Sequence, residues 1–97
     1  MKTMKTGTQL IAEERQRQIE VIGRTPERDS VYKANQLIMA SVAYALNAAG
    51  FTSPMPPNEW PWHENYWKPS TKIRDLVKAG ALIAAEIDRL QREEEQK

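Results

Sequence analysis

The stretch from Ser70 to Leu90, STKIRDLVKAGALIAAEIDRL, is the most regular part of the chain and decides the expected fold. Apolar or small residues recur in it at alternating spacings of four and three, a heptad pattern typical of a helix that packs along one side. The seam positions are Leu76, Gly80, Ile83, Ile87 and Leu90. Val77 and Ala84 widen the seam into a stripe that we expect to face the core. Ser70 is the expected N-cap, and the helix runs toward the polar tail at 91–97.

Gly80 lies in mid-seam, where glycine costs about 1 kcal/mol of helix propensity relative to alanine. We expect it where a second backbone comes close, and the preceding helix offers a partner rich in small residues. These are Ala34, Ala40, Ser41, Ala45, Ala48 and Ala49. A helix of about 25 residues would be roughly 38 Å long. Because this length exceeds the diameter of a domain of this size, the seam also predicts a homodimer or a higher assembly.

Two more helices are expected upstream. The first covers residues 8–22 and is ended by Gly23. The second starts from a cap at Asp29 or Ser30 and extends to about Ala49. The predicted fold class is therefore all-α, with three helices and a long Pro/Trp-rich loop between the second and the third.

The loop after the second helix is unusual in length and composition. Gly50 followed by Phe51 predicts a Schellman stop with its hydrophobic contact. The segment 52–69 then holds five prolines, all three tryptophans and the only histidine of the chain. Loops this long inside compact domains are uncommon and are often functional. The aromatic side chains either plug a small core or form a stacking surface for a ligand, and the sequence leaves both readings open.

Size and composition favour one domain over residues 1–97, with frayed ends at 1–7 and 92–97. The net charge of +1 predicts no long nucleic acid as a partner. Cysteine is absent, which excludes disulfides and thiolate zinc sites and favours a cytoplasmic location. No signal peptide or membrane-spanning run is expected.

Cations gather around the aromatic loop and suggest an anionic ligand. The first helix adds a polar island on the side that should meet the core, and the third helix has a positive N-terminal end. Aromatic faces can stack a base while Arg and Lys hold phosphate. The expected ligand-binding residues are Arg15, Gln18, Arg24, Trp60, Trp62, His63, Tyr66, Trp67, Lys68, Lys72 and Arg74.

Catalysis has little support. His63 is the only imidazole, and neither a nucleophile with a base nor a Gly-rich phosphate loop is recognisable. The acidic motifs of MazG-like nucleotide pyrophosphohydrolases match poorly: Arg17 stands where the third glutamate of the first motif belongs, and the pair Glu86 and Asp88 is one residue too close. We predict no catalytic residue, no metal and no cofactor.

Several blocks of the chain resemble a family of small phage and prophage proteins of unassigned activity. They are 14–18, 23–29, 60–62, 67–69, 74–83 and 85–90. The sequence departs from the family pattern at Arg24, at 28–30 and at 35–37, which include positions where acids would be expected. These departures from the family pattern therefore favour a binding protein over an enzyme.

The function expected from the sequence is that of a phage accessory protein in the cytoplasm of a bacterial host. It would bind a small anionic ligand without turnover, with a nucleotide or a cyclic nucleotide signal of bacterial immunity as the candidate. One alternative is a metal-dependent nucleotide hydrolase using Glu14, Asp29 and Asp75. The other is an inhibitor that docks its aromatic loop on a host protein.

Overall fold

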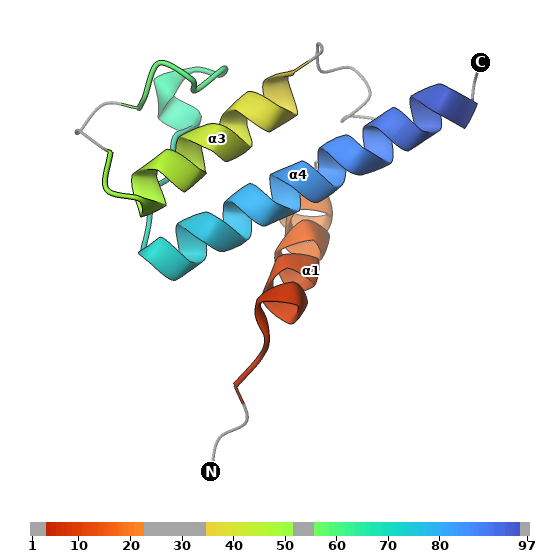
Figure 1. The fold of residues 1–97 in the computed structure, drawn as a ribbon, viewed down its shortest axis with the longest axis horizontal. Coiled ribbons are helices and arrows are strands. Elements are labelled where there is room, and N and C mark those ends of the chain that lie inside the picture. The colour runs from red at the N-terminus through yellow and green to blue at the C-terminus, as the bar shows by residue number, and fades with distance from the viewer. Residues whose placement is uncertain (1–3, 23–34, 52–55, 96–97) are drawn as a thin grey trace.

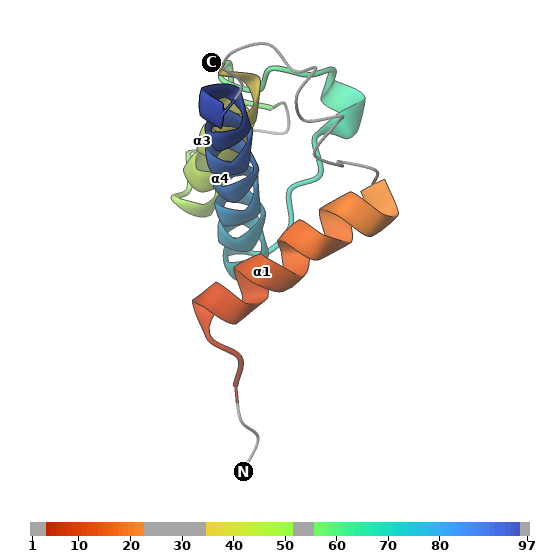
Figure 2. The same cartoon turned by 90° about the vertical axis from the view of Figure 1, so that its right-hand side faces the viewer.

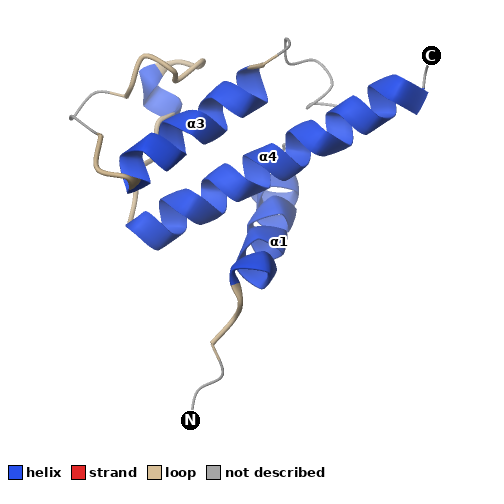
Figure 3. Cartoon of the chain, viewed as in Figure 1, coloured by secondary structure: helices blue, strands red, loops and turns tan. Residues whose placement is uncertain are grey.

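The computed structural model describes residues 4–22, 35–51 and 56–95. These ranges form helix α1 (Gly7–Arg17), the π-helical turn η1 (Gln18–Ile22), helix α3 (Gln36–Ala48), the 3-10 turn η2 (Glu64–Tyr66) and helix α4 (Lys72–Glu95). No strand occurs in these ranges, and Figure 3 shows only helices and connections. The all-α class with three helices is confirmed.

Helices α3 and α4 lie side by side and run in opposite directions (Figure 1). Helix α1 packs on α4 and crosses it steeply, as the rotated view in Figure 2 shows. The connection that carries η2 passes behind α3, as seen in Figure 1, before α4 begins. None of the helices in the described ranges has both the length and the apolar character that crossing a bilayer requires.

The ends of the helices follow local capping chemistry. Thr6 and Gln9 form a capping box at the start of α1. The helix begins at Gly7, one residue before the expected start at residue 8. At the end of α3, Gly50 has a φ of +93° and the amide of Phe51 donates to the carbonyl of Leu46 at 3.0 Å. These features confirm the Schellman stop. The Phe51 side chain is 72% exposed, so it buries little of its ring in the hydrophobic contact that the sequence predicts for this stop.

Helix α4 begins one residue later than its expected cap implies. The Thr71 hydroxyl accepts from the amide of Arg74 at 3.2 Å, which is the N-cap bond, while the amide of Ser70 donates to Asp75 at 2.8 Å. The prediction of Ser70 as N-cap is therefore wrong. At its other end α4 stays helical through Glu95, within the segment expected to fray. The residues Gly23, Asp29 and Ser30 lie outside the described ranges. Helix α3 begins only at Gln36, because Asn35 before it has a left-handed φ of 74°, so the expected start of the second helix at Asp29 or Ser30 is too early.

Small residues let α3 and α4 approach closely, as predicted. Their shared core holds Leu37, Ala40 and Ala43 from α3, with Ala79, Leu82 and Ala85 from α4. Because alanine side chains are short, the two backbones can come together and leave the remaining volume to larger rings from the loop.

The face that α4 turns to the core differs from the prediction. The buried residues of α4 are Asp75, Val77, Ala79, Ala81, Leu82, Ala85 and Glu86. The predicted seam faces outward instead, and its four large residues Leu76, Ile83, Ile87 and Leu90 are between 43% and 53% exposed. The heptad spacing identified an apolar stripe correctly but not its partner, because α3 packs on the alanines of another face of α4 and α1 crosses beside the stripe at Gly80.

Gly80 does mark a close approach, but α1 and not α3 makes it. A Cβ at this position would lie 2.5 Å from Cδ1 and 2.8 Å from Cγ1 of Ile11. The predicted role of Gly80 in the contact between the second and third helices is therefore corrected: the glycine makes room for the Ile11 side chain where α1 crosses α4.

Replacing Gly80 with leucine should overpack this crossing and lower the free energy of unfolding by about 1–3 kcal/mol. Thermal or urea unfolding followed by circular dichroism measures the change. Gly7→Ala is the control, since a Cβ there meets nothing within 4 Å. Adding Ile11→Ala to Gly80→Leu should restore part of the loss, because it removes the clashing atoms. Equal stability of Gly80→Leu and the wild type would refute the crossing.

Candidate functional site

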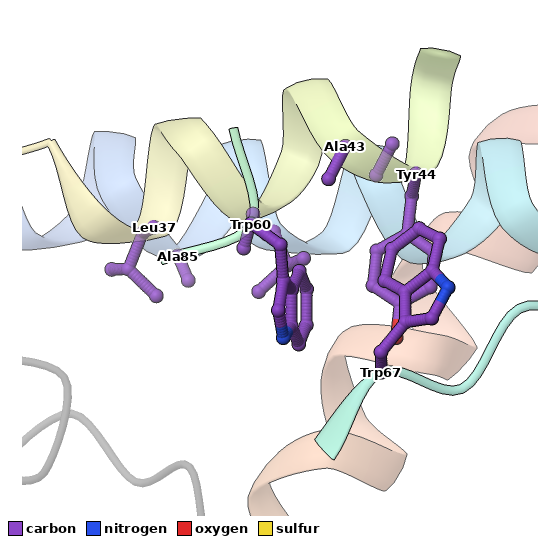
Figure 4. Packing of buried hydrophobic residues seen from close by; sticks show 9 residues of the cluster. Leu37, Ala43, Tyr44, Trp60, Trp67 and Ala85 are labelled. Carbon is purple, nitrogen blue, oxygen red and sulfur yellow. The ribbon is translucent and has the colours of Figure 1, made fainter. Parts of the chain in front are cut away.

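The aromatic loop places two of its tryptophans in the core. Trp60 is 8% exposed and Trp67 is 9% exposed, and both pack against Tyr44 of α3 (Figure 4). The Trp67 ring stacks on Tyr44 with centroids 4.7 Å apart, and Trp60 meets Tyr44 edge-on at 5.4 Å. Protein side chains therefore cover these rings, which act as a plug over the alanine-lined contact of α3 and α4.

The other aromatic residues of the loop lie nearer the surface. Trp62 is half-buried and packs edge-on against Trp60 at 5.3 Å. His63 is exposed and caps η2, because its Nδ1 accepts from the amide of Asn65 at 3.0 Å. The His63 carbonyl also accepts from Trp60 Nε1 at 3.1 Å. Tyr66 is 66% exposed, so its ring is open to a ligand.

A pocket of about 430 Å³ opens between α1, α3, α4 and the loop. It is lined by Glu14, Arg17, Gln18, Tyr44, Tyr66, Lys68, Lys78 and Leu82. Its volume falls in the usual range for small-molecule sites, about 300–1,000 Å³. The lining carries three cations and one carboxylate, together with two tyrosine rings.

Hydrogen bonds hold the wall that Tyr44 forms. The amide of Lys68 donates to the Tyr44 hydroxyl at 3.3 Å, and Lys78 Nζ donates to the Lys68 carbonyl at 2.6 Å. The Lys78 ammonium also lies 5.4 Å from the centre of the Tyr44 ring, within reach of a cation–π interaction. Burial lowers the pKa of Lys78 from its ordinary value, although nearby Asp75 opposes the shift. Tyr44 and Lys78 thus form one linked wall.

Glu14 stands at the centre of a buried ionic cluster on the opposite wall. Its side chain is 0% exposed and accepts from Arg17 Nε and Nη2 at 2.8 Å each, in a two-point arrangement. Arg74 of α4 donates to the same carboxylate, so the cluster ties α1 to α4. Burial alone would raise the pKa of Glu14, but the bonds from Arg17 and Gln18 and the charge of Arg74 outweigh it and lower the pKa. The same pairing with Glu14 raises the pKa of Arg17.

Gln18 adds a buried amide to this wall. Its Nε2 donates to Glu14 Oε2 at 3.1 Å, which fixes the side chain. Its carbonyl oxygen Oε1 is buried and has no hydrogen-bond partner among the described residues. A buried acceptor without a donor is unfavourable, so this oxygen would gain from a donor group on a ligand.

Of the residues expected from the sequence, the structure brings Gln18, Tyr66 and Lys68 to the pocket. Arg15 lies on α1 and pairs with Asp88 of α4 at 3.7 Å, and Arg74 is held by Glu14. Trp62, His63 and the exposed Lys72 are not among the lining residues. Arg24 lies outside the described residues.

The two described carboxylates of the hydrolase alternative already accept hydrogen bonds from other groups of the protein. Glu14 is bound by two arginines, and Asp75 accepts from the Asn47 side chain and from the amide of Ser70. Asp29 lies outside the described residues. Within the described ranges, no group of three His, Asp or Glu side chains is arranged to hold a metal ion.

Comparisons with protein-family models, curated proteins and solved structures found no match to this chain.

Proposed function

We propose that the protein binds a small, anionic, nucleotide-like ligand in the pocket between α1, α3 and α4, without turning it over. The observation that carries the proposal is the convergence of Lys68 and Lys78 on one pocket that also presents tyrosine rings, while Arg17 lines the same pocket with its guanidinium bound to Glu14. Cationic groups of this kind hold phosphate by charge-assisted hydrogen bonds, and aromatic rings stack on a base.

The two ends of such a ligand have different partners in the pocket. Lys68 and Lys78 both line the pocket and give it two cations that suit a phosphate, and Lys78 Nζ donates to the Lys68 carbonyl. The exposed ring of Tyr66 is the candidate stacking face. The unpartnered Oε1 of Gln18 is an acceptor for a ring or exocyclic N–H group of a base.

Binding without turnover is favoured over hydrolysis by the state of the carboxylates. A hydrolase needs a carboxylate able to act as a base or to hold a cation, and Glu14 and Asp75 are each bound by protein donors. His63 caps η2 and is not among the lining residues. The docking alternative has less exposed aromatic surface to use, because Trp60 and Trp67 are buried.

We also propose that the biological setting is that of a phage accessory protein in the cytoplasm of a bacterial host, acting by sequestering a nucleotide signal. This rests on the resemblance drawn from the sequence. Self-association is a further part of the proposal, supported by the exposed apolar stripe of α4.

Neutralising Lys68 should weaken nucleotide binding roughly tenfold, which corresponds to about 1.4 kcal/mol, because one charge-assisted hydrogen bond is lost. Isothermal titration calorimetry with nucleoside monophosphates and cyclic dinucleotides measures the effect for Lys68→Gln. Lys72→Gln is the matched control, since it removes the same charge from an exposed position that is not among the lining residues. It should change the dissociation constant by less than about twofold.

Two outcomes would count against the proposal. Equal losses in Lys68→Gln and Lys72→Gln would mean that the ligand senses general charge and not this pocket. Recovery of hydrolysed nucleotide after incubation with magnesium would favour the enzyme alternative. Recovery of intact nucleotide supports binding without turnover.

A further inference from the structure

The outward face of α4 carries an apolar stripe that the described part of the chain leaves uncovered. With 3.6 residues per turn, Leu76, Ile83, Ile87 and Leu90 fall within about 60° of one another around the helix. All four are between 43% and 53% exposed, and Ile73 at the start of the helix is 67% exposed. Large apolar residues gathered on one helix face mark an interaction surface.

The charge along α4 points to the kind of partner. Residues 72–80 hold three cations and one acid, whereas residues 86–95 hold five acids and two cations. Arg74, Glu86 and Asp88 are paired within the chain, whereas Lys72 at the start of α4 and Glu94 and Glu95 at its end are exposed. A second α4 running in the opposite direction would set the exposed cation of each helix against the exposed acids of the other. A parallel copy would place like charges together. The helix is therefore complementary to itself only in the antiparallel sense.

We propose that a second copy of this chain docks on the stripe, with the two α4 helices antiparallel and the two-fold axis at the level of Ala81 and Leu82. In this register each seam position meets a seam position of the other copy. The layers are Ile73 with Leu90 of the partner subunit, Leu76 with Ile87 of the partner subunit and, at the level of Gly80, Ile83 of the partner subunit with Ile11, which fills the space over the glycine. Each layer occurs twice, so the arrangement closes as a dimer.

The charged flank of the stripe agrees with this register. Lys72 and Glu93 are both exposed and occupy equivalent flanking positions of the heptad pattern, 21 residues apart. In the antiparallel pair, Lys72 of one copy faces Glu93 of the partner subunit at each end. The interface leaves the pocket open, because Lys78 and Leu82 line the pocket from another face of α4.

The mass of the protein in solution tests the pairing. Light scattering at high micromolar concentration should give the mass of a dimer for the wild type. Ile87→Glu should give a monomer, because it sets a carboxylate in two of the layers. Phe51→Glu is the matched control, since Phe51 is a large exposed residue outside α4, and it should remain dimeric. Ile87→Glu should keep the helical circular dichroism spectrum, because Ile87 makes no part of the buried core.

Cross-linking tests the direction, and the absence of native cysteine makes it specific. A Lys72→Cys, Glu93→Cys double variant should give covalent dimers with a short thiol-reactive cross-linker. Lys72→Cys alone should give none, because the two copies of residue 72 lie at opposite ends of the pair. A monomeric wild type would overturn the proposal, as would covalent dimers of Lys72→Cys alone or a dimer in which the double variant fails to cross-link.

Discussion

Trp67→Ala should lower the free energy of unfolding by about 3–5 kcal/mol, enough to leave much of a domain this small unfolded. Trp67 is buried, stacks on Tyr44 and contacts Trp60, so its removal opens a cavity at the centre of the plug. Urea unfolding followed by tryptophan fluorescence and by circular dichroism measures the loss, with the melting temperature as a second readout.

The neighbouring Tyr66 gives the matched contrast. Tyr66→Ala changes an exposed ring that lines the pocket, so stability should stay within about 0.5 kcal/mol of the wild type. Nucleotide binding should weaken by about 1–3 kcal/mol if this ring stacks the base. A stable Trp67→Ala variant with weakened binding would show the reverse assignment, with Trp67 as the stacking face and not the plug.

Glu14→Gln should lower the free energy of unfolding by about 2–3 kcal/mol, because it leaves Arg17 and Arg74 without their shared carboxylate. Glu13→Gln is the matched control on the adjacent residue. The Glu13 carboxylate pairs with Lys5 at the surface, with side chains 55% and 58% exposed, so its loss should cost less than about 1 kcal/mol. Similar losses in the two variants would contradict the central place of Glu14.

The effect of Glu14 should depend on pH in a defined direction. Its pKa in the folded protein lies below the ordinary value of 4.5, so the folded state binds its proton less readily than the unfolded state does. The stabilisation by the carboxylate is then complete above the ordinary value and is lost as the pH falls through the lower, folded-state pKa. The difference in stability between the wild type and Glu14→Gln should shrink over that acidic window and stay constant above it.

The helices could be predicted because their signals are local. The glycine at position 50 with an apolar residue after it defined the end of α3, and the 4-and-3 spacing identified α4. The partner of each face could not be predicted. Periodicity finds an apolar stripe, but the alanines of another face of α4 are buried more completely than the larger residues of the stripe, since small side chains allow close packing of backbones.

The candidate site was predictable only in part. Gln18, Tyr66 and Lys68 were expected near a ligand, whereas Tyr44 and Lys78 were not. Both lie inside helices that read as packing elements, and their meeting depends on how α3 and α4 pack. One signal was present in the sequence: a tyrosine among the small residues of the second helix must find room for its hydroxyl at the edge of the core. The pairing of Glu14 with Arg17, at i and i+3, was a second.

The most direct test of the account is an NMR titration of the isotope-labelled protein with nucleoside monophosphates, cyclic dinucleotides and the parent nucleosides. The proposed function predicts saturable shifts for at least one phosphate-bearing compound, centred on the backbone signals of Gln18, Tyr44, Lys68 and Lys78, with much weaker shifts for its nucleoside. Absence of saturable shifts for every nucleotide at millimolar concentration, or shifts confined to the stripe of α4, would contradict a nucleotide-binding pocket.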